Sequence, residues 1–201
     1  IGTIELPVQS ARVDLGDPEK LTSGFKKCVD DLEGLDILAV CHGTLHIAEA
    51  TDHGKDGWDK TINVNLTSVF SLNQLAGRHM IKQGSGKIIN IASMLSFSGG
   101  LMATSYAASK GGVAQLTKAL ANEWSGKGVN VNAIAPGYIQ TKLNKHIWSD
   151  PVRNQQILDR LPSGRWGVPS DLIGATIFLS SAASDYVHGV ILPVDGGWLA
   201  R

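Results

Sequence analysis

The residues best suited to chemistry are a serine, a tyrosine and a lysine: Ser93, Tyr106 and Lys110. Tyr106 and Lys110 are four positions apart, so on a helix they lie one turn apart on the same face. A free tyrosine has a pKa of about 10, which is too high for a base at neutral pH. A nearby ammonium favours the phenolate and is expected to lower that pKa towards the working pH. The three residues therefore predict proton transfer to or from a carbonyl group.

The elements around these residues support this interpretation. Ser93 follows an apolar run over residues 88–92, which is typical of a buried parallel strand. Tyr106 and Lys110 begin a predicted helix over residues 104–126, whose inner face carries Val113, Leu116, Leu120 and Trp124. A Tyr-x-x-x-Lys pattern alone is often a solvated helix face. A serine at the end of the preceding strand favours a catalytic set instead.

The rest of the chain alternates predicted strands and helices. Further strands are expected at residues 8–15, 36–40, 129–134 and 190–194, and further helices at 18–32, 58–83, 152–158 and 169–182. In the helix over 58–83, the residues expected to face inward are Ile62, Leu66, Val69, Phe70, Leu75 and Met80. This alternation is typical of an α/β protein with a doubly wound parallel sheet in three α/β/α layers. Since no repeat or linker is visible, we expect one Rossmann-like domain over residues 1–201.

The composition argues against several kinds of partner. The 18 basic and 18 acidic residues balance, which gives no electrostatic reason to expect nucleic acid or an anionic membrane. Two cysteines, Cys28 and Cys41, make no disulfide framework and favour a reducing, cytoplasmic compartment. No apolar run approaches the ~20 residues that span a bilayer. His42 and His46 lack a visible third ligand, so no metal is expected.

The pattern resembles the short-chain dehydrogenase/reductase family. The resemblance rests on Ser93, the Tyr106–Lys110 pair and the later Pro136-Gly137. The stretches G-K-I-I-N-I-A-S-M-L-S-F and N-V-N-A-I-A-P-G-Y and the ending D-G-G-W-L-A-R are most similar, within that family, to dehydrogenases of deoxy sugar acids. The strong similarity covers roughly residues 58–201.

This resemblance implies an oxidoreductase that uses NAD or NADP. It would move a hydride between the nicotinamide and a secondary alcohol or ketone, with a deoxy sugar acid such as 2-deoxy-D-gluconate as substrate. Tyr106 would give or take the proton, and Lys110 would lower the pKa of Tyr106. Ser93 would hold the carbonyl oxygen, and Asn65 would support the proton path. A 3-oxoacyl-carrier-protein reductase is the alternative within the same chemistry.

The resemblance also implies a cofactor site. Its positions are Asp14, Gly43, Tyr106, Lys110, Pro136, Gly137, Ile139 and Thr141. Pro136 and Gly137 would let the backbone approach the nicotinamide closely. Asp14 would contact the adenine, although a cap or turn role is an equal alternative. The family usually has N-N-A-G where this chain reads Val40-Cys41-His42-Gly43, so only the glycine remains.

Two surface features are expected to serve the substrate and other subunits. Residues 138–168 should be mostly irregular and form a substrate lid, because loops beyond the carboxyl ends of strands carry specificity. In this lid Arg165 either pairs with a sugar-acid carboxylate or ties the lid down, and the structural role is favoured. Gly111 and Gly112 suggest close helix packing, and the resemblance implies a homodimer or homotetramer.

The start of the chain lacks one feature of a dinucleotide-binding fold. Such folds open with a strand, a glycine-rich turn and a helix that holds the pyrophosphate. No such glycine pattern follows a strand near Ile1, so the first strand–helix–strand unit is expected to precede the printed sequence, and Asp14 would end the third strand. A chain that truly starts at Ile1 should bind a dinucleotide poorly. The non-enzymatic alternative is a cofactor-free relative that associates with other subunits.

Overall fold

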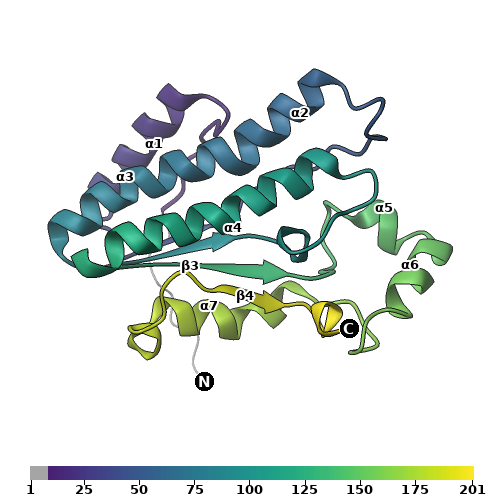
Figure 1. The fold of residues 1–201 in the computed structure, drawn as a ribbon. Helices are drawn as coiled ribbons and strands as arrows, with labels where there is room; N and C mark the ends of the chain where they lie inside the picture. The colour runs from purple at the N-terminus through teal and green to yellow at the C-terminus, as the bar shows by residue number, and fades with distance from the viewer. Residues whose placement is uncertain (1–8) are drawn as a thin grey trace.

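A four-stranded parallel sheet forms the centre of the computed structural model, which describes residues 9–201 (Figure 1). The strands are β1 (Ile37–Val40), β2 (Gly86–Ile91), β3 (Val129–Pro136) and β4 (Ile191–Val194), paired in that order. Because all the strands are parallel, their carboxyl ends share one edge of the sheet. Every strand predicted after residue 35 is confirmed, and β3 extends to Pro136 rather than stopping at Ile134.

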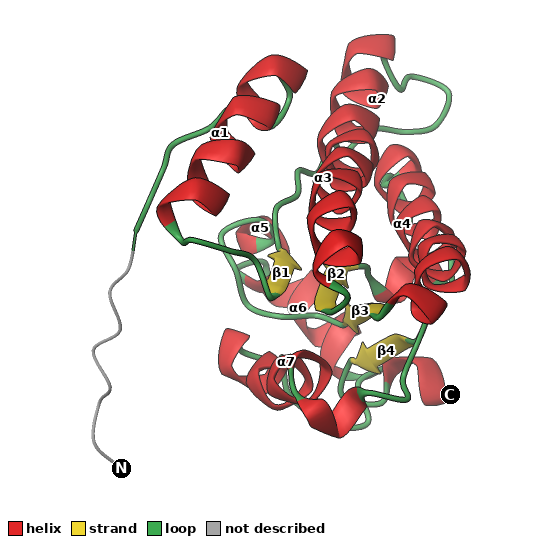
Figure 2. Ribbon diagram, turned by 90° about the vertical axis from the view of Figure 1, so that its left-hand side faces the viewer, coloured by secondary structure: helices red, strands yellow, loops and turns green. Residues whose placement is uncertain are grey.

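Helices cover both faces of the sheet. They are α1 (Pro18–Asp31), α2 (Lys55–Ile62), α3 (Ser68–Gln83), α4 (Thr104–Trp124), α5 (Lys145–Trp148), α6 (Pro151–Leu158) and α7 (Ile173–Ser180). Figure 2 shows α3 and α4 on one face of the sheet, α7 on the opposite face and α1 beside α3. The predicted three-layer, Rossmann-like arrangement is therefore confirmed.

The buried side chains of the strands alternate between these two helix layers. Ile88 and Val131 pack with Met80 in the core beneath α3 and α4. Ile89 and Ile134 lie on the opposite face of the sheet and pack with residues such as Leu179 of α7. This period of two is what a strand covered on both faces requires. It explains why these strands read in the sequence as continuous apolar runs.

A buried polar network joins β2 to α3 and α4, the two helices on one face of the sheet. Asn90 on β2 exchanges hydrogen bonds with Asn73 on α3, at 2.8 and 3.1 Å, and donates to the Thr117 hydroxyl on α4 at 3.1 Å. All three side chains are fully buried. A satisfied network of this kind fixes one arrangement of helices and strand. It holds α4, and hence the residues on that helix, in register with the end of β2.

The predicted strand over residues 8–15 is wrong where the structure describes it. Residues 9–14 have no regular structure and lead into a turn before α1, while Val8 lies outside the described residues. Val13 packs instead onto Gly24 of α1, where an added Cβ would meet its side chain at 2.4 Å. Within residues 9–201 no strand pairs with this segment, and a strand needs a partner for its backbone groups.

The helix predicted over 58–83 is interrupted. A π-helical turn, Asn63–Thr67, separates α2 from α3, and α2 begins three residues earlier than predicted, at Lys55. A π-turn inserts a residue into the helical repeat, so a periodicity of 3.6 does not extend across it. This is why Phe70, predicted to face inward, is 42% exposed.

The other boundary differences are local. The helix predicted over 104–126 ends at Trp124 and continues as a 3₁₀ turn. The helix predicted over 169–182 is a 3₁₀ turn, Pro169–Leu172, followed by α7. The segment 138–168 contains α5 in addition to the expected short helix α6.

Candidate active site

A cavity of about 460 Å³ opens at the carboxyl ends of β2 and β3. Ser93 and Met94 follow β2, and Gly137 and Tyr138 follow β3, and all four line the cavity. Tyr106 lines it from the first turns of α4. The structure therefore brings Ser93, Tyr106 and Gly137 together around one space.

Ser93 is held at the cavity by a small turn. Its Oγ accepts the backbone N–H of Leu95 at 3.1 Å, which caps the 3₁₀ turn Met94–Ser96. The Ser96 hydroxyl accepts the Ser93 N–H at 3.2 Å and donates to the Lys110 carbonyl at 2.6 Å. The turn after β2 is thus fastened to α4 directly beside the residues with which Ser93 is expected to act.

Lys110 lies behind the tyrosine and is only 3% exposed. Its ammonium donates to the Ile91 carbonyl at the end of β2, at 2.6 Å, and lies 5.8 Å from the centre of the Tyr106 ring. Burial lowers the pKa of Lys110 to about 8, because the interior disfavours the charged form. An ammonium has three donors, so two remain for other groups.

The expected effect of Lys110 on the tyrosine is not what the structure shows. Burial raises the pKa of Tyr106 above its usual value, and the neighbouring Ser93 hydroxyl acts in the opposite direction. The Lys110 ammonium bonds to the Ile91 carbonyl, away from the phenol oxygen. The sequence-based prediction of a lowered tyrosine pKa is therefore wrong, because the desolvation of the phenol outweighs its neighbours.

Asn65 sits in the π-turn and is fully buried. Its Oδ1 accepts the Thr44 N–H at 2.7 Å, and its Nδ2 donates to the Thr44 carbonyl at 2.9 Å and to the Ser109 hydroxyl at 3.1 Å. The Ser109 hydroxyl in turn donates to the Tyr106 carbonyl at 2.7 Å. The side chain of Asn65 thus joins the loop after β1 to the turn of α4 that carries Tyr106 and Lys110.

Sequence reasoning missed the π-turn that carries Asn65. The available signal was Asn63-Val64-Asn65, since asparagine and valine are poor helix formers and here lie in the middle of a long helical pattern. His42 contacts the same turn from the loop after β1: its Nε2 lies 3.0 Å from the Val64 carbonyl and 2.6 Å from the Ser68 hydroxyl. Burial lowers the pKa of His42, which favours the neutral ring.

Two glycines lie at close approaches near the site: Gly43 beside the lysine, and Gly137 against the loop after β4. A Cβ on Gly43 would lie 3.6 Å from the Asn65 Oδ1 and 3.9 Å from the Lys110 ammonium, so this glycine lies directly over the amine. A Cβ on Gly137 would lie 2.6 Å from the Asp195 Cα, so only glycine fits there. A nicotinamide with its ribose needs open backbone, such as that of Gly43, beside unused hydrogen-bond donors, such as those of Lys110. The residues around Lys110 therefore fit the nicotinamide end of a dinucleotide.

The remaining predicted cofactor residues lie farther from the cavity. Pro136 ends β3, and Ile139 after it is buried and forms a parallel bridge with Gly167. Asn144 accepts the N–H and hydroxyl of Thr141, at 3.1 and 3.0 Å, and donates to the Ile139 carbonyl at 2.8 Å. Ile139 and Thr141 thus belong to one loop, but neither lines the cavity that Ser93 and Tyr106 share.

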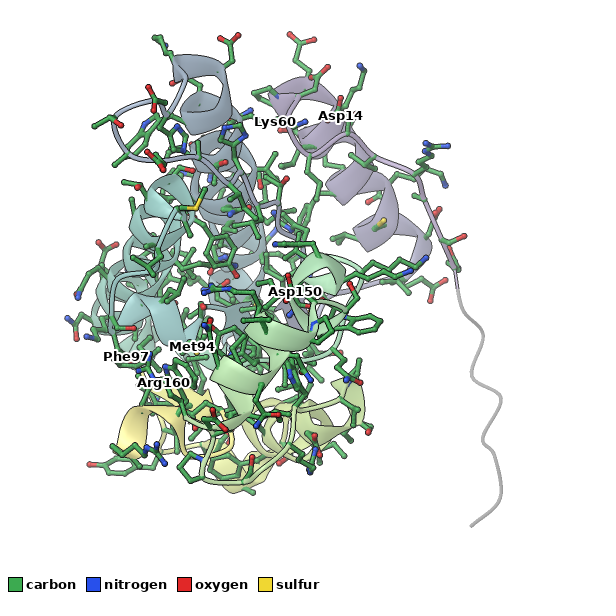
Figure 3. All side chains as sticks on the ribbon, turned by 90° about the vertical axis from the view of Figure 1, so that its right-hand side faces the viewer. Asp14, Lys60, Met94, Phe97, Asp150 and Arg160 are labelled. Carbon is green, nitrogen blue, oxygen red and sulfur yellow. The ribbon has the colours of Figure 1, made fainter. Side chains whose placement is uncertain are left out.

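Asp14 is not brought to that cavity. Its carboxylate accepts the Gly16 N–H at 3.0 Å, and the Gly16 carbonyl accepts from Asn63 of the π-turn at 3.0 Å. In Figure 3 Asp14 lies beside Lys60, far across the view from Met94. The structure thus gives Asp14 the turn role that was its alternative, and its contact with adenine stays a prediction.

Arg165 ties down the segment 138–168, the role favoured from the sequence. Its two guanidinium NH groups donate to the two carboxylate oxygens of Asp171, at 2.8 and 3.0 Å, and one also donates to the Trp166 carbonyl at 3.0 Å. The paired guanidinium lowers the pKa of Asp171 to about 2. Sequence reasoning missed two other arginines, Arg153 and Arg160, which do line the cavity.

Within residues 9–201, neither a membrane-crossing helix nor a metal-binding cluster is found. No helix in that part of the chain combines the length and hydrophobicity needed to cross a membrane. The same residues include no group of three or more side chains placed to hold a metal ion.

Comparisons with known proteins agree with the geometry. A family model described as enoyl-(acyl carrier protein) reductase matches residues 3–199. The 2-dehydro-3-deoxy-D-gluconate 5-dehydrogenase of Bacillus subtilis strain 168 is 51% identical over 96% of this chain and 75% of its own length. The Escherichia coli K12 protein of the same name is 47% identical over 96% of this chain and 76% of its own.

A solved structure shows the same fold with a cofactor. The gluconate 5-dehydrogenase of Burkholderia cenocepacia J2315, in complex with NADP and tartrate, has a TM-score of 0.90 and 38% identity, covering 94% of this chain and 74% of that one. With a matching family model and relatives at this identity, the family predicted from Ser93, Tyr106 and Lys110 is confirmed. The chain belongs to the short-chain dehydrogenase/reductase family.

Proposed function

We propose that this protein transfers a hydride between NAD or NADP and a secondary alcohol or ketone of a deoxy sugar acid, such as 2-deoxy-D-gluconate. The observation that carries the proposal is the meeting of the Ser93 and Tyr106 side chains at one cavity, with the Lys110 amine buried behind them. The names of the B. subtilis and E. coli relatives support a sugar-acid substrate. The tartrate bound to the B. cenocepacia protein is also a hydroxy acid.

Each residue has one task in this reaction. When bound, the nicotinamide supplies or accepts the hydride. In the direction of reduction, the Ser93 hydroxyl holds the carbonyl oxygen, and Tyr106 donates its proton to that oxygen as negative charge develops there. Because burial raises the pKa of Tyr106, the phenol is protonated at neutral pH and carries the proton that this step needs. In the direction of oxidation, the alcohol proton passes back to Tyr106.

The other site residues hold this pair and the cofactor in place. Lys110 uses its two remaining N–H donors for the nicotinamide ribose, in the space that Gly43 leaves over the amine. Asn65 keeps α4 fixed against the loop after β1 and supports the proton path. Gly137 allows the nicotinamide to approach the end of β3.

We also propose the wider arrangement that the family suggests. The chain would act as one domain, with residues 138–168 as the lid over the substrate. It would work in the cytoplasm as a homodimer or homotetramer. Sedimentation of the purified protein tests the assembly, because a monomer at working concentration would contradict it.

The proposed reaction is tested by supplying substrate and following the nicotinamide. The purified protein is mixed with NAD or NADP in the oxidised form and 2-deoxy-D-gluconate, and the reduced cofactor is measured by its fluorescence. We expect turnover with the sugar acid and none with a 3-oxoacyl thioester plus reduced cofactor. Turnover of the thioester alone would favour the acyl-carrier alternative. A folded sample that binds neither cofactor would favour a cofactor-free relative.

A further inference from the structure

We propose that Arg153 and Arg160 form the subsite that binds the carboxylate of the substrate. This inference rests on the proposed function, because it assigns the acidic end of the sugar acid to named residues. It reverses the sequence-based alternative, in which Arg165 was the arginine considered for that task. Arg165 is held by Asp171 and does not line the cavity that Ser93 and Tyr106 share.

The two arginines share one face of the lid. Arg153 lies on α6 and Arg160 lies just beyond its end, seven positions later, which is close to two helical turns. Gln156 and Ile157 fall between them on the same face, and all four residues line the cavity. One wall of the cavity is therefore made by a single helical face that carries a guanidinium at each end.

Charge distinguishes this wall from the rest of the cavity. Among the residues that line the cavity, Arg153 and Arg160 are the only ones with ionised side chains, and no carboxylate is among them. Within residues 9–201 neither arginine takes part in a salt bridge, although Arg165 a few positions later does. The cavity thus has a net positive wall with no counter-charge from the chain, and an anionic group on the ligand would supply one.

Local contacts hold both guanidiniums near the cavity. Arg160 stacks over the ring of Trp198, with its Cζ 4.1 Å from the ring centre, and Arg153 donates to the Gln156 side chain at 3.1 Å. Trp198 and Tyr138 line the same cavity, and the positive charges of both arginines oppose the burial that raises the pKa of Tyr138. In Figure 3 Arg160 lies beside Met94, the residue after Ser93. Both arginines therefore line the same cavity as the Ser93 and Tyr106 hydroxyls.

This placement matches the shape of a sugar acid. A guanidinium binds a planar carboxylate through two parallel hydrogen bonds, which fixes direction as well as affinity. With its carboxylate held at the lid wall, the carbon chain of the substrate extends towards Ser93 and Tyr106. Neutral sugars and alcohols lack the group that the arginines bind. Arg153 and Arg160 would therefore set the choice of sugar acids over neutral analogues.

The test compares an acid with its neutral amide. Arg160→Gln and Arg153→Gln are assayed with 2-deoxy-D-gluconate and with 2-deoxy-D-gluconamide, and Arg78→Gln, an exposed arginine of α3 outside the cavity lining, is the matched control. Loss of a charge-assisted hydrogen bond should raise KM for the acid about 10- to 150-fold per arginine. KM for the amide and kcat for either compound should change little, and the control should behave as wild type.

Other outcomes overturn the proposal. If wild type uses acid and amide equally well, or if each variant weakens both compounds to the same degree, the arginines do not read the carboxylate. A second measurement does not need turnover: Trp198 reports on Arg160, so tryptophan fluorescence is titrated with 2-deoxy-D-gluconate and with the amide. A response to the acid that Arg160→Gln abolishes supports the subsite even if hydride transfer to this substrate fails. An equal response to both compounds contradicts it.

Discussion

One wall of the cavity, formed by the end of β2 and the start of α4, rests on a buried scaffold that includes the π-turn, and the polar atoms of this scaffold are already bonded to one another. Lys110 and Asn65 are 3% and 0% exposed, and each has defined partners in the chain. The wall formed by α6 is exposed, and its Arg153 and Arg160 have no carboxylate partner within residues 9–201. The first wall can hold reacting groups in fixed geometry, whereas the second is free to bind a charged ligand.

This difference separates chemistry from specificity. A proton donor must be positioned to within fractions of an ångström, and only a packed, hydrogen-bonded scaffold achieves that. A substrate-selecting wall needs accessible charge, and a short helix in a connecting segment provides it at little risk to the fold. Substitutions on the first wall should therefore affect turnover or stability, whereas substitutions on the second should affect the choice of substrate.

A large effect on turnover is expected at Ser93, at the end of β2. Ser93→Ala removes the hydroxyl that holds the developing oxyanion, so kcat should fall about 10²- to 10³-fold while the fold is kept. Steady-state kinetics with the sugar acid measure it. Ser98→Ala is the matched control, because this serine lines the same cavity without facing a proposed step. Equal losses in both variants would show that Ser93 has no special task.

A substitution of Asn65 should affect stability rather than affinity. Asn65→Ala leaves the backbone groups of Thr44 and the Ser109 hydroxyl without their partner, which should lower the free energy of unfolding by about 2–4 kcal/mol. Arg153→Gln on the exposed wall should change that free energy by less than about 0.5 kcal/mol. Urea unfolding of both variants makes the comparison, and equal destabilisation would contradict it.

Replacing Lys110 should stabilise the fold and abolish turnover. Its pKa is lowered to about 8 in the folded chain from an ordinary 10.5, so the unfolded chain binds more protons between these values and stability should rise with pH across that window. Lys110→Met should therefore raise the free energy of unfolding by about 2 kcal/mol at pH 7 while abolishing turnover. The gain should shrink as the pH rises from about 8 towards 10.5. Denaturation at several pH values measures it, and a pH-independent difference would refute it.

The smallest expected effect is in the segment 138–168, at Arg165. The folded pKa of Asp171 is lowered to about 2 from 3.8, so the pair stabilises the fold above the unfolded value and this support is lost as the pH falls between the two. Arg165→Gln should lower the Tm slightly at neutral pH and not at all near pH 2. Thermal melts at both pH values decide, and a Tm difference that persists in acid would count against the pair.

The sequence predicted the sheet, its covering helices and the Ser93–Tyr106–Lys110 set because these depend on local periodicity and spacing. It did not predict the π-turn at Asn63–Thr67, because one inserted residue is invisible to a pattern that assumes a regular helix. The sign of the Tyr106 pKa shift was also out of reach, since it depends on burial. Arg153 and Arg160 were missed because the direction in which α6 faces is set by tertiary packing.

In the proposed reaction, the Tyr106 phenol carries the proton. Hydride transfer in a single turnover, measured for wild type and Tyr106→Phe together with the affinity for the cofactor, tests it most directly. The rate should fall by about 10³-fold or more, while the Kd of the cofactor, for which Lys110 and Gly137 are the proposed contacts, stays close to that of wild type. A Tyr106→Phe rate within about tenfold of wild type would contradict the claim.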